Sequence, residues 1–309
     1  MVRGAFVTWR KTSGRTRSLA EELGLELLSL KSKVPYLGEA VETFRLLKGY
    51  DLVFVQVPQG ALLWLASLLK SRGFKLVADI HSGFILLDSP KLKLLNWPFR
   101  GTILKSDLIL VHNSEIVKLL PDSVKDKVIV VYDPPLRGVK WEGGGGYAVI
   151  PAGGYGDEDI RPIIKAIAKS GVLKEVHLTG PGKPLITHIN GVKIVRTGFL
   201  EWNRYLDELK KADLLIAITQ REYTFLRSAW EALCIGAPFV ISDTRTLRSI
   251  YKELPEWAFL KRHVEHIITS MTILKSRYEE LLKGVEAARS RLLSEAEKQL
   301  RYLKEKISD

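Results

Sequence analysis

The chain has 309 residues, of which 46% are hydrophobic and 27% charged, and its formal net charge is +12. This length exceeds the usual size of a single core and predicts two domains, and the composition excludes a disordered chain. The longest apolar run, 61–69, is too short to cross a bilayer, and the first residues lack the apolar segment of a signal peptide. We therefore expect a cytoplasmic protein.

The positive charge is unevenly distributed. Residues 1–140 contain 21 Lys or Arg and 13 Asp or Glu, a net +8, whereas the remainder contains 26 and 22, a net +4. Such an excess favours anionic partners, namely nucleotide phosphates, lipid headgroups or nucleic acid. The single cysteine, Cys234, cannot close an internal disulfide. Asn and Gln are sparse beside Lys, Arg and Glu, a bias that accompanies high growth temperature in some proteomes.

In the first half, short β-rich runs alternate with helical patterns. The runs cover residues 4–9, 25–30, 51–57, 74–80, 108–112 and 128–132. They are apolar on both faces, as is typical of parallel strands covered by helices on both sides. Residues 1–135 are therefore predicted to form one open α/β sheet.

A linker and a second set of runs follow. Residues 136–146 end in four consecutive glycines and are predicted to be a flexible linker. The next β-rich runs cover residues 147–152, 175–180, 192–198, 213–219 and 238–243. They predict a second α/β domain over 147–275, and the amphipathic segment 276–309 is predicted to be a long helix that braces the two domains. Ligands of such doubly wound folds bind beyond the carboxyl ends of the strands, so we expect a site in a cleft between the domains.

The segment FLRSAWEALCIGAPFVISD predicts a helix that ends at Gly236 and is followed by a buried strand. Glu231 interrupts the apolar stripe of this helix, four residues after Arg227. Its spacing is compatible with a surface ion pair worth a few tenths of a kcal/mol. A functional role for the carboxylate is the alternative.

The stretch EALCIGAPFVISD resembles the EA-x-x-x-G-x-P-V-V-x-S-D segment of retaining glycosyltransferases of family 4, which have the GT-B architecture. TSGRTRSLAEELG, KLVADIHSG and the segment 193–222 are similar to further parts of that family, in the same order. The resemblance implies two Rossmann-like domains facing a cleft, with the acceptor on the N-terminal side and the nucleotide-sugar on the C-terminal side. It also implies hexosyl transfer with retention of the anomeric configuration.

The resemblance assigns roles to particular residues. It implies that Glu231 binds both hydroxyls of the donor ribose, a bidentate arrangement that suits a carboxylate. It places Thr224 and Phe225 beside the donor, and His81 of DIHSG beside the transferred hexose. The nucleotide-sugar is the substrate, and neither a cofactor nor a metal is predicted.

Two departures from the family pattern affect the predicted site. The family has a second glutamate eight residues before the first, where this chain has Tyr223, and Glu222 precedes it. Glu222 is therefore predicted to be the displaced catalytic acid, if the loop lets it reach the sugar. The glycine-rich segment 151–159 lacks the Arg and Lys that commonly hold the donor diphosphate, and Lys183 is the nearest substitute.

Further anion-binding groups are predicted near the N-terminus. Ser13 and Gly14 lie between a strand and a helix, where backbone N–H groups and the helix dipole can meet a phosphate, although a plain turn is an equal alternative. Arg15 could add a charged contact there. The segment LKLLNWPFRGTILK mixes aromatic and basic residues, which suits either an anionic membrane surface or a core helix with a basic outer side.

Three functions compete on these observations. The first is a glycosyltransferase that acts on a glycan or lipid-linked acceptor. The second is a catalytically weak GT-B-fold protein that binds a glycan or a partner, because Tyr223 stands where the family has an acid. The third, nucleic-acid binding, ranks lowest because no motif of a known RNA-binding module is present.

Overall fold

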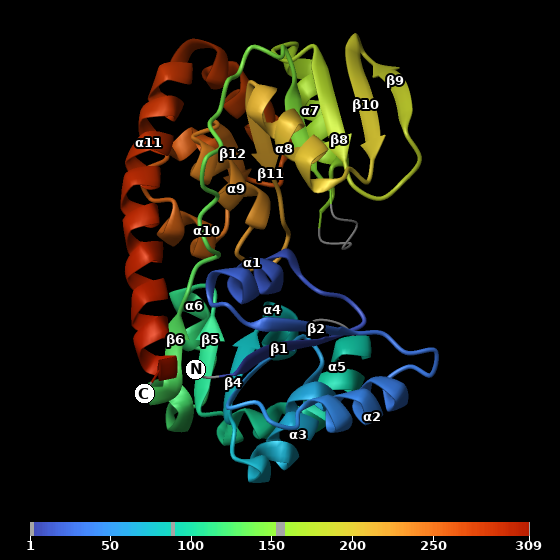
Figure 1. The fold of residues 1–309 in the computed structure, drawn as a ribbon. Coiled ribbons are helices and arrows are strands. Elements are labelled where there is room, and N and C mark those ends of the chain that lie inside the picture. The colour runs from blue at the N-terminus through green and yellow to red at the C-terminus, as the bar shows by residue number, and fades with distance from the viewer. Residues whose placement is uncertain (1–2, 88–89, 153–157, 309) are drawn as a thin grey trace. The chain divides into compact units, whose positions relative to one another are not determined.

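The computed structural model describes residues 3–87, 90–152 and 158–308 (Figure 1). The chain divides into two compact units. The first consists of Met1–Pro134 with Glu295–Asp309, and the second of Pro135–Ser294. Each unit has its own β-sheet and its own covering helices. The predicted fold class, two Rossmann-like α/β domains, is confirmed.

The first unit contains a sheet of six strands in the order β2-β1-β3-β4-β5-β6, all parallel. They are β1 (Gly4–Trp9), β2 (Glu26–Leu30), β3 (Leu52–Val57), β4 (Lys75–Ile80), β5 (Leu108–Val111) and β6 (Val128–Val130). Every residue of β3 is buried, whereas the edge strand β2 is largely exposed. Because the inner strands are buried on both faces, their sequences are continuous apolar runs, and these runs predicted the strands.

Helices cover both faces of this sheet. They are α1 (Gly14–Glu22), α2 (Leu37–Leu46), α3 (Gly60–Leu69), α4 (Ser82–Leu86), α5 (Pro90–Asn96) and α6 (Ser114–Val117), with 3₁₀ segments η1 (Lys70–Arg72), η2 (Trp97–Lys105) and η3 (Asp122–Lys127). In one core cluster Leu19 of α1 and Leu300 of the C-terminal helix pack with Phe6 and Phe54 of the sheet. Helices α2 and α3 lie side by side across the sheet from α1 (Figure 1).

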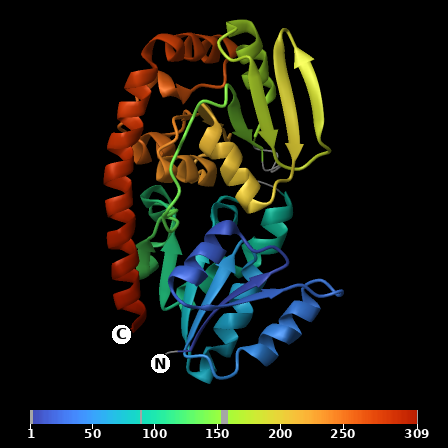
Figure 2. The same cartoon turned by 45° about the horizontal axis from the view of Figure 1, so that its top comes forward.

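The second unit contains a sheet of seven strands in the order β13-β12-β11-β7-β8-β10-β9. They are β7 (Ala148–Pro151), β8 (Glu175–Thr179), β9 (Leu185–Ile189), β10 (Val192–Gly198), β11 (Leu214–Ala217), β12 (Phe239–Ser242) and β13 (Phe259–Leu260). Only β9, at the edge of the sheet, is antiparallel to its neighbour among these strands (Figure 2). The sequence did not predict β9 or β13, because β9 is mostly exposed and β13 has only two residues.

The helix that the sequence predicts before β12 is present in the second unit. Its helices are α7 (Arg161–Ser170), α8 (Trp202–Lys211), α9 (Arg227–Ile235), α10 (Arg245–Ile250) and the first part of α11 (Val264–Ser308), with η4 (Glu256–Ala258). Gly236 ends α9 with a φ of +82°, which confirms the predicted helix stop. Helix α11 has a non-helical residue at Arg277, and its turns from Glu295 on belong to the first unit. Among the helices that the structure describes, none combines the length and apolar character needed to span a bilayer.

Candidate functional site

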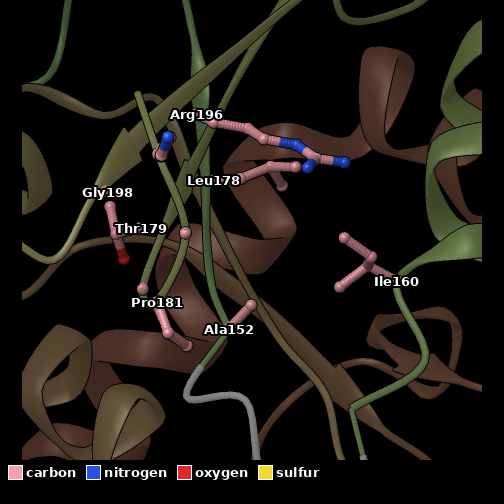
Figure 3. Close-up of a pocket in the computed structure, with 10 residues that line it drawn as sticks. Ala152, Ile160, Leu178, Thr179, Pro181, Arg196 and Gly198 are labelled. Carbon is pink, nitrogen blue, oxygen red and sulfur yellow. The ribbon is translucent and has the colours of Figure 1, made fainter. Parts of the chain in front are cut away.

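A cavity of about 160 Å³ lies in the second unit at the carboxyl ends of β7, β8 and β10. Ligands of doubly wound sheets bind at this edge. The lining residues are Ala152, Ile160, Leu178, Thr179, Gly180, Pro181, Gly182, Lys183, Arg196 and Gly198. The Arg196 side chain extends past Leu178 in the direction of Ile160 (Figure 3).

Glycine at position 180 allows the strand ends around this cavity to approach closely. Gly180 has a φ of +144°, and a Cβ built on it would lie 1.8 Å from the carbonyl oxygen of Ala152. Two backbone hydrogen bonds join the strand ends, from Ala152 N to Thr179 O (2.8 Å) and from Gly180 N to Gly198 O (3.1 Å). No L-residue with a side chain fits this position without moving backbone. The glycines of LTGPG therefore form the wall of the cavity.

Two cations border the cavity. Lys183, predicted as a substitute for the family's diphosphate-binding residues, lines it together with Arg196, and both side chains are exposed. The sequence analysis missed Arg196. Its signal was a cation two residues before a glycine at the end of a predicted strand, VKIVRTG. The glycine-rich segment 151–159 begins beside the cavity, but its residues 153–157 lie outside the described residues.

Glu231 lies on α9 and is buried, with only 5% of its surface exposed. Arg227 donates a hydrogen bond from Nε to Glu231 Oε1 at 2.6 Å, so the predicted pair exists but is not a surface pair. The buried hydroxyl of Tyr205, on α8, faces the same carboxylate. Burial, followed by the negative charge of Glu231, raises the pKa of Tyr205 well above its ordinary value. Glu231 is thus held between Arg227, which the spacing of the sequence indicated, and Tyr205, which it did not.

Glu222 is in the loop between β11 and α9, and its carboxylate is engaged with backbone groups. It accepts hydrogen bonds from the backbone N–H of Thr246 (2.8 Å) and of Arg245 (3.2 Å), at the start of α10. Burial acts to raise the pKa of Glu222, but these backbone donors outweigh it and hold the pKa below its ordinary value. Tyr223 adopts a φ of +61°, and its N–H donates to Thr246 Oγ1 at 3.1 Å. This loop therefore ties Glu222 to α10.

Thr224 and Phe225 complete the loop before α9. The hydroxyl of Thr224 is buried and has no hydrogen-bond partner among the described residues. The Phe225 ring packs against Trp230 with ring centroids 5.6 Å apart. Of this pair only Thr224 has a polar side-chain atom, and that atom is buried.

In the first unit, Arg15 is the centre of a buried charge cluster. Its Nε donates to Asp79 Oδ1 at 3.0 Å, and one terminal nitrogen donates to Asp133 Oδ1 at 3.0 Å and to the carbonyl of Val131 at 2.8 Å. Burial acts to raise the pKa of Asp79, but the charge of Arg15 outweighs it and lowers that pKa. Only 5% of the Arg15 surface is exposed, and its guanidinium is paired with two carboxylates of the protein.

His81 follows β4 and is next to this cluster. Its Nε2 lies 3.3 Å from Asp79 Oδ2, and neither atom has a well-aligned hydrogen-bond partner in the part of the chain that the structure describes. His112, at the end of β5, is also buried; burial, together with the positive charges of Arg15 and His81, lowers its pKa to about 3. The structure thus brings Arg15 and His81 together around Asp79. An aspartate within the apolar strand run KLVADI was the signal for this contact.

Ser13 and Gly14 begin α1. The Ser13 hydroxyl accepts the backbone N–H of Thr16 at 3.1 Å, and its own N–H donates to Gln56 Oε1 at 2.8 Å. Ser13 is therefore the N-cap of α1, and the helix begins at Gly14.

Comparisons with known proteins place the fold. Neither a protein-family model nor a curated protein sequence matches this chain. Among solved structures, Anabaena HepE in complex with UDP and glucose has a TM-score of 0.76 and 11% identity over 100% of both chains. A sucrose-phosphate synthase from Thermosynechococcus elongatus has a TM-score of 0.70 and 12% identity over 99% of this chain and 98% of that one. A glycosyltransferase from Rickettsia africae has a TM-score of 0.67 and 12% identity over the same shares. At these identities the likeness shows the fold, two Rossmann-like domains of the GT-B type.

Proposed function

We propose that this protein is a glycosyltransferase that moves a hexose from a nucleotide-sugar to a glycan or lipid-linked acceptor, with retention of configuration. The observation that carries the proposal is the glycine-walled cavity with Lys183 and Arg196 at the carboxyl ends of β7, β8 and β10. A chain-wide fold match to HepE in complex with UDP and glucose supports it. Retention is supported by the resemblance of EALCIGAPFVISD to the retaining family.

The donor diphosphate is proposed to bind in this cavity. Two cations on an exposed rim can form charge-assisted contacts with phosphate oxygens, and the absence of side chains on Gly180 and Gly182 lets the backbone approach them. Lys183→Ala and Arg196→Ala should each weaken nucleoside-diphosphate binding about tenfold or more. Lys174→Ala, which removes an exposed lysine of the same unit outside the cavity lining, is the matched control.

Glu231 is proposed to bind the ribose hydroxyls. Its link to Arg227 fixes one carboxylate oxygen, and a carboxylate can form strong charge-assisted acceptor contacts with hydroxyl groups. Glu231→Ala should therefore weaken nucleotide binding by about 2 kcal/mol. Nucleotide binding as tight as that of the wild-type protein would remove Glu231 from the site.

His81 is proposed to contact the transferred hexose. Asp79, held by Arg15, lies on one side of the imidazole and limits the orientations that the ring can take. In the retaining mechanism that the resemblance implies, the leaving phosphate helps to deprotonate the acceptor, so the protein contributes positioning and electrostatic stabilisation. Glu222 can act as the sugar-side acid only after it leaves the backbone of α10. His81→Ala should lower turnover far more than nucleotide affinity.

A thermal-shift panel of UDP-, GDP-, ADP- and CMP-sugars tests the proposal, followed by donor hydrolysis with the donor that binds. A donor at about one hundred times its dissociation constant should stabilise the protein by about 2.7 kcal/mol. The proposal fails if no nucleotide-sugar stabilises the protein. It also fails if the donor binds but is neither hydrolysed nor transferred to any glycan or lipid-linked sugar.

The second candidate function is a GT-B-fold protein that binds a glycan or partner without efficient transfer. The engagement of Glu222 with the start of α10 favours it, because the displaced acid is then unavailable to the sugar. Donor hydrolysis separates the two functions, since only the enzyme consumes the nucleotide-sugar.

A further inference from the structure

Helix α2 of the first unit has an inverted pattern of burial. Its buried side chains include Glu39 and Thr43, whereas Leu37, Val41 and Phe44 are exposed. The exposed residues follow the spacing i, i+4, i+7, which defines one stripe along a helix. Because a helix on a water-exposed protein surface normally buries its apolar stripe, this stripe indicates a non-aqueous partner.

Hydrogen bonds fix the orientation of α2. Glu39 accepts the backbone N–H of Ser32 at 3.0 Å and lies 3.5 Å from the Arg10 guanidinium. Thr43 accepts a hydrogen bond from Trp9 Nε1 at 2.9 Å and donates to the carbonyl of Glu39 at 2.7 Å. Rotating the helix to bury its apolar stripe would break these buried hydrogen bonds. The free energy lost when they break exceeds the free energy that Glu39 and Thr43 would regain by contact with water. The apolar stripe therefore stays on the surface.

The neighbouring elements extend this apolar surface. The Arg72 guanidinium of η1 lies 4.3 Å from the centroid of the Phe44 ring and links the segment after α3 to α2. Trp64 of α3 packs against Phe99 of η2 with ring centroids 6.0 Å apart. Leu94 is 79% exposed and Trp97 is 70% exposed. Helix α3 contacts α2, α5 and η2. The exposed large apolar side chains of these elements and of the segment just before α2, called here the α2–α3–η2 face, are Val34, Tyr36, Leu37, Val41, Phe44, Leu46, Trp64, Leu68, Leu94, Trp97 and Leu104.

The charge of the same segments is strongly positive. Residues 31–48, 60–72 and 90–105 together contain ten Lys or Arg and two Glu. Of the two acids, Glu39 is fully buried against its partners. Lys93 and Arg100 are exposed on either side of Trp97. Aromatic and aliphatic side chains interleaved with Lys and Arg are the composition that partitions to the boundary between headgroups and acyl chains.

We propose that the α2–α3–η2 face binds the surface of a bilayer that contains anionic lipids. The apolar side chains enter the interface and the Lys and Arg side chains pair with the headgroups. A second copy of the chain fits less well, because a two-fold dimer would press this positive face against itself. Nucleic acid would neutralise the cations but leave the leucines and valines in water. The inference does not depend on the proposed glycosyl transfer.

Co-sedimentation with vesicles tests the proposal on the full chain. Vesicles of phosphatidylcholine with phosphatidylglycerol should bind the protein, vesicles of phosphatidylcholine alone should bind it weakly, and high salt should release it. The charge variant Lys93→Glu with Arg100→Glu should weaken binding at least about 25-fold, since each basic residue contributes about fivefold. The apolar variant Leu94→Ser with Trp97→Ser should weaken it about tenfold.

Matched controls are available on α11 in the same unit. Tyr302→Ser removes an exposed aromatic residue, and Lys298→Glu with Arg301→Glu makes the same change in net charge. These controls should stay within about twofold of the wild-type protein, and thermal melts should show that every variant is folded. Equal losses in the two charge variants would overturn the proposal, because net charge alone would then explain binding.

Three other outcomes overturn the proposal. They are no binding to the anionic vesicles, binding that the apolar variant leaves unchanged, and self-association without lipid that Leu94→Ser with Trp97→Ser abolishes. Binding of an oligonucleotide in the absence of vesicle binding would assign the face to nucleic acid instead.

Discussion

The carboxyl edges of the two sheets use charged residues in opposite ways. In the first unit Arg15 is buried and shared between Asp79 and Asp133. In the second unit Lys183 and Arg196 stand exposed around a cavity walled by glycine. A buried cation paired with two carboxylates organises the protein, whereas exposed cations beside backbone are available to an anionic ligand. Two units of the same fold class thus differ at this edge: the first has a buried, paired cation, and the second has exposed cations beside a cavity.

The largest expected effect follows from breaking the buried cluster. Arg15→Leu leaves Asp79 and Asp133 without their shared cation in a buried site, so the first unit should lose about 3–5 kcal/mol of unfolding free energy. Lys183→Leu, at the exposed edge of the second unit, should change the unfolding free energy of that unit by less than about 0.5 kcal/mol. Guanidinium chloride unfolding measures both variants.

A compensating variant separates lost charge from lost packing. Arg15→Leu combined with Asp79→Asn and Asp133→Asn removes the uncompensated charges, so part of the lost stability should return. If the triple variant is no more stable than Arg15→Leu, the charge cluster does not account for the effect.

The next effect concerns the glycine wall of the exposed edge. Gly180→Ala should destabilise the second unit by about 2–3 kcal/mol, because the added Cβ meets the backbone of Ala152 and neither atom can move freely. Gly182→Ala is the control. It has a φ of +132°, but no atom of the described residues lies within 4 Å of the added Cβ, so only the backbone strain remains, at about 1 kcal/mol. Equal losses in both variants would show that close approach at Gly180 is unimportant.

The stability of the two units should also depend on pH in opposite directions, through His112 in the first unit and His177 in the second. The pKa of His112 in the first unit is about 3, below the unfolded value of about 6.5, so the unfolded state binds the proton more readily. Stability from His112 is therefore present above about pH 6.5 and lost as the pH falls, by about 2 kcal/mol at pH 5. His112→Gln should remove this acid sensitivity. Unfolding free energies at pH 7 and pH 5 measure it.

His177 of the second unit shows the opposite shift. Burial acts to lower its pKa, but the carboxylates of Glu208 (2.6 Å) and Glu175 (2.9 Å) outweigh it, so the pKa is raised. Its contribution is present below the unfolded value and is lost as the pH rises through the folded pKa. In an NMR titration His177 should titrate above pH 6.5, whereas His112 should stay neutral down to pH 5. Titration of both near 6.5 would contradict the contrast.

The fold was more predictable from the sequence than the site. Buried parallel strands are continuous apolar runs, so β1 and β10 were predicted with their observed bounds, and Gly236 marked the end of α9. β9 was missed because an exposed edge strand such as LITHI lacks that run.

Contacts in the site depend on packing between segments distant in sequence, which one sequence does not reveal. Arg15 and Asp133 are 118 residues apart. Tyr205 and Glu231 are on different helices. The inverted burial of α2 could not be read either, because its apolar stripe alone predicts a buried face. The resemblance to a known family named candidate site residues, and the structure showed which side chains they contact.

The smallest expected effect decides whether Glu222 is the displaced catalytic acid. Glu222 accepts the backbone N–H groups at the start of α10, so Glu222→Ala should cost about 1 kcal/mol of stability, and Glu222→Gln, which keeps one acceptor oxygen, should cost less. Because the carboxylate is engaged there, Glu222→Gln should retain turnover within about threefold, whereas His81→Ala should lower it about a hundredfold. The measurement is steady-state transfer with the donor found in the thermal-shift panel. A hundredfold loss in Glu222→Gln, with its melting temperature unchanged, would instead make Glu222 the displaced catalytic acid, because removing a negative charge from a helix cap cannot slow the chemistry by that amount.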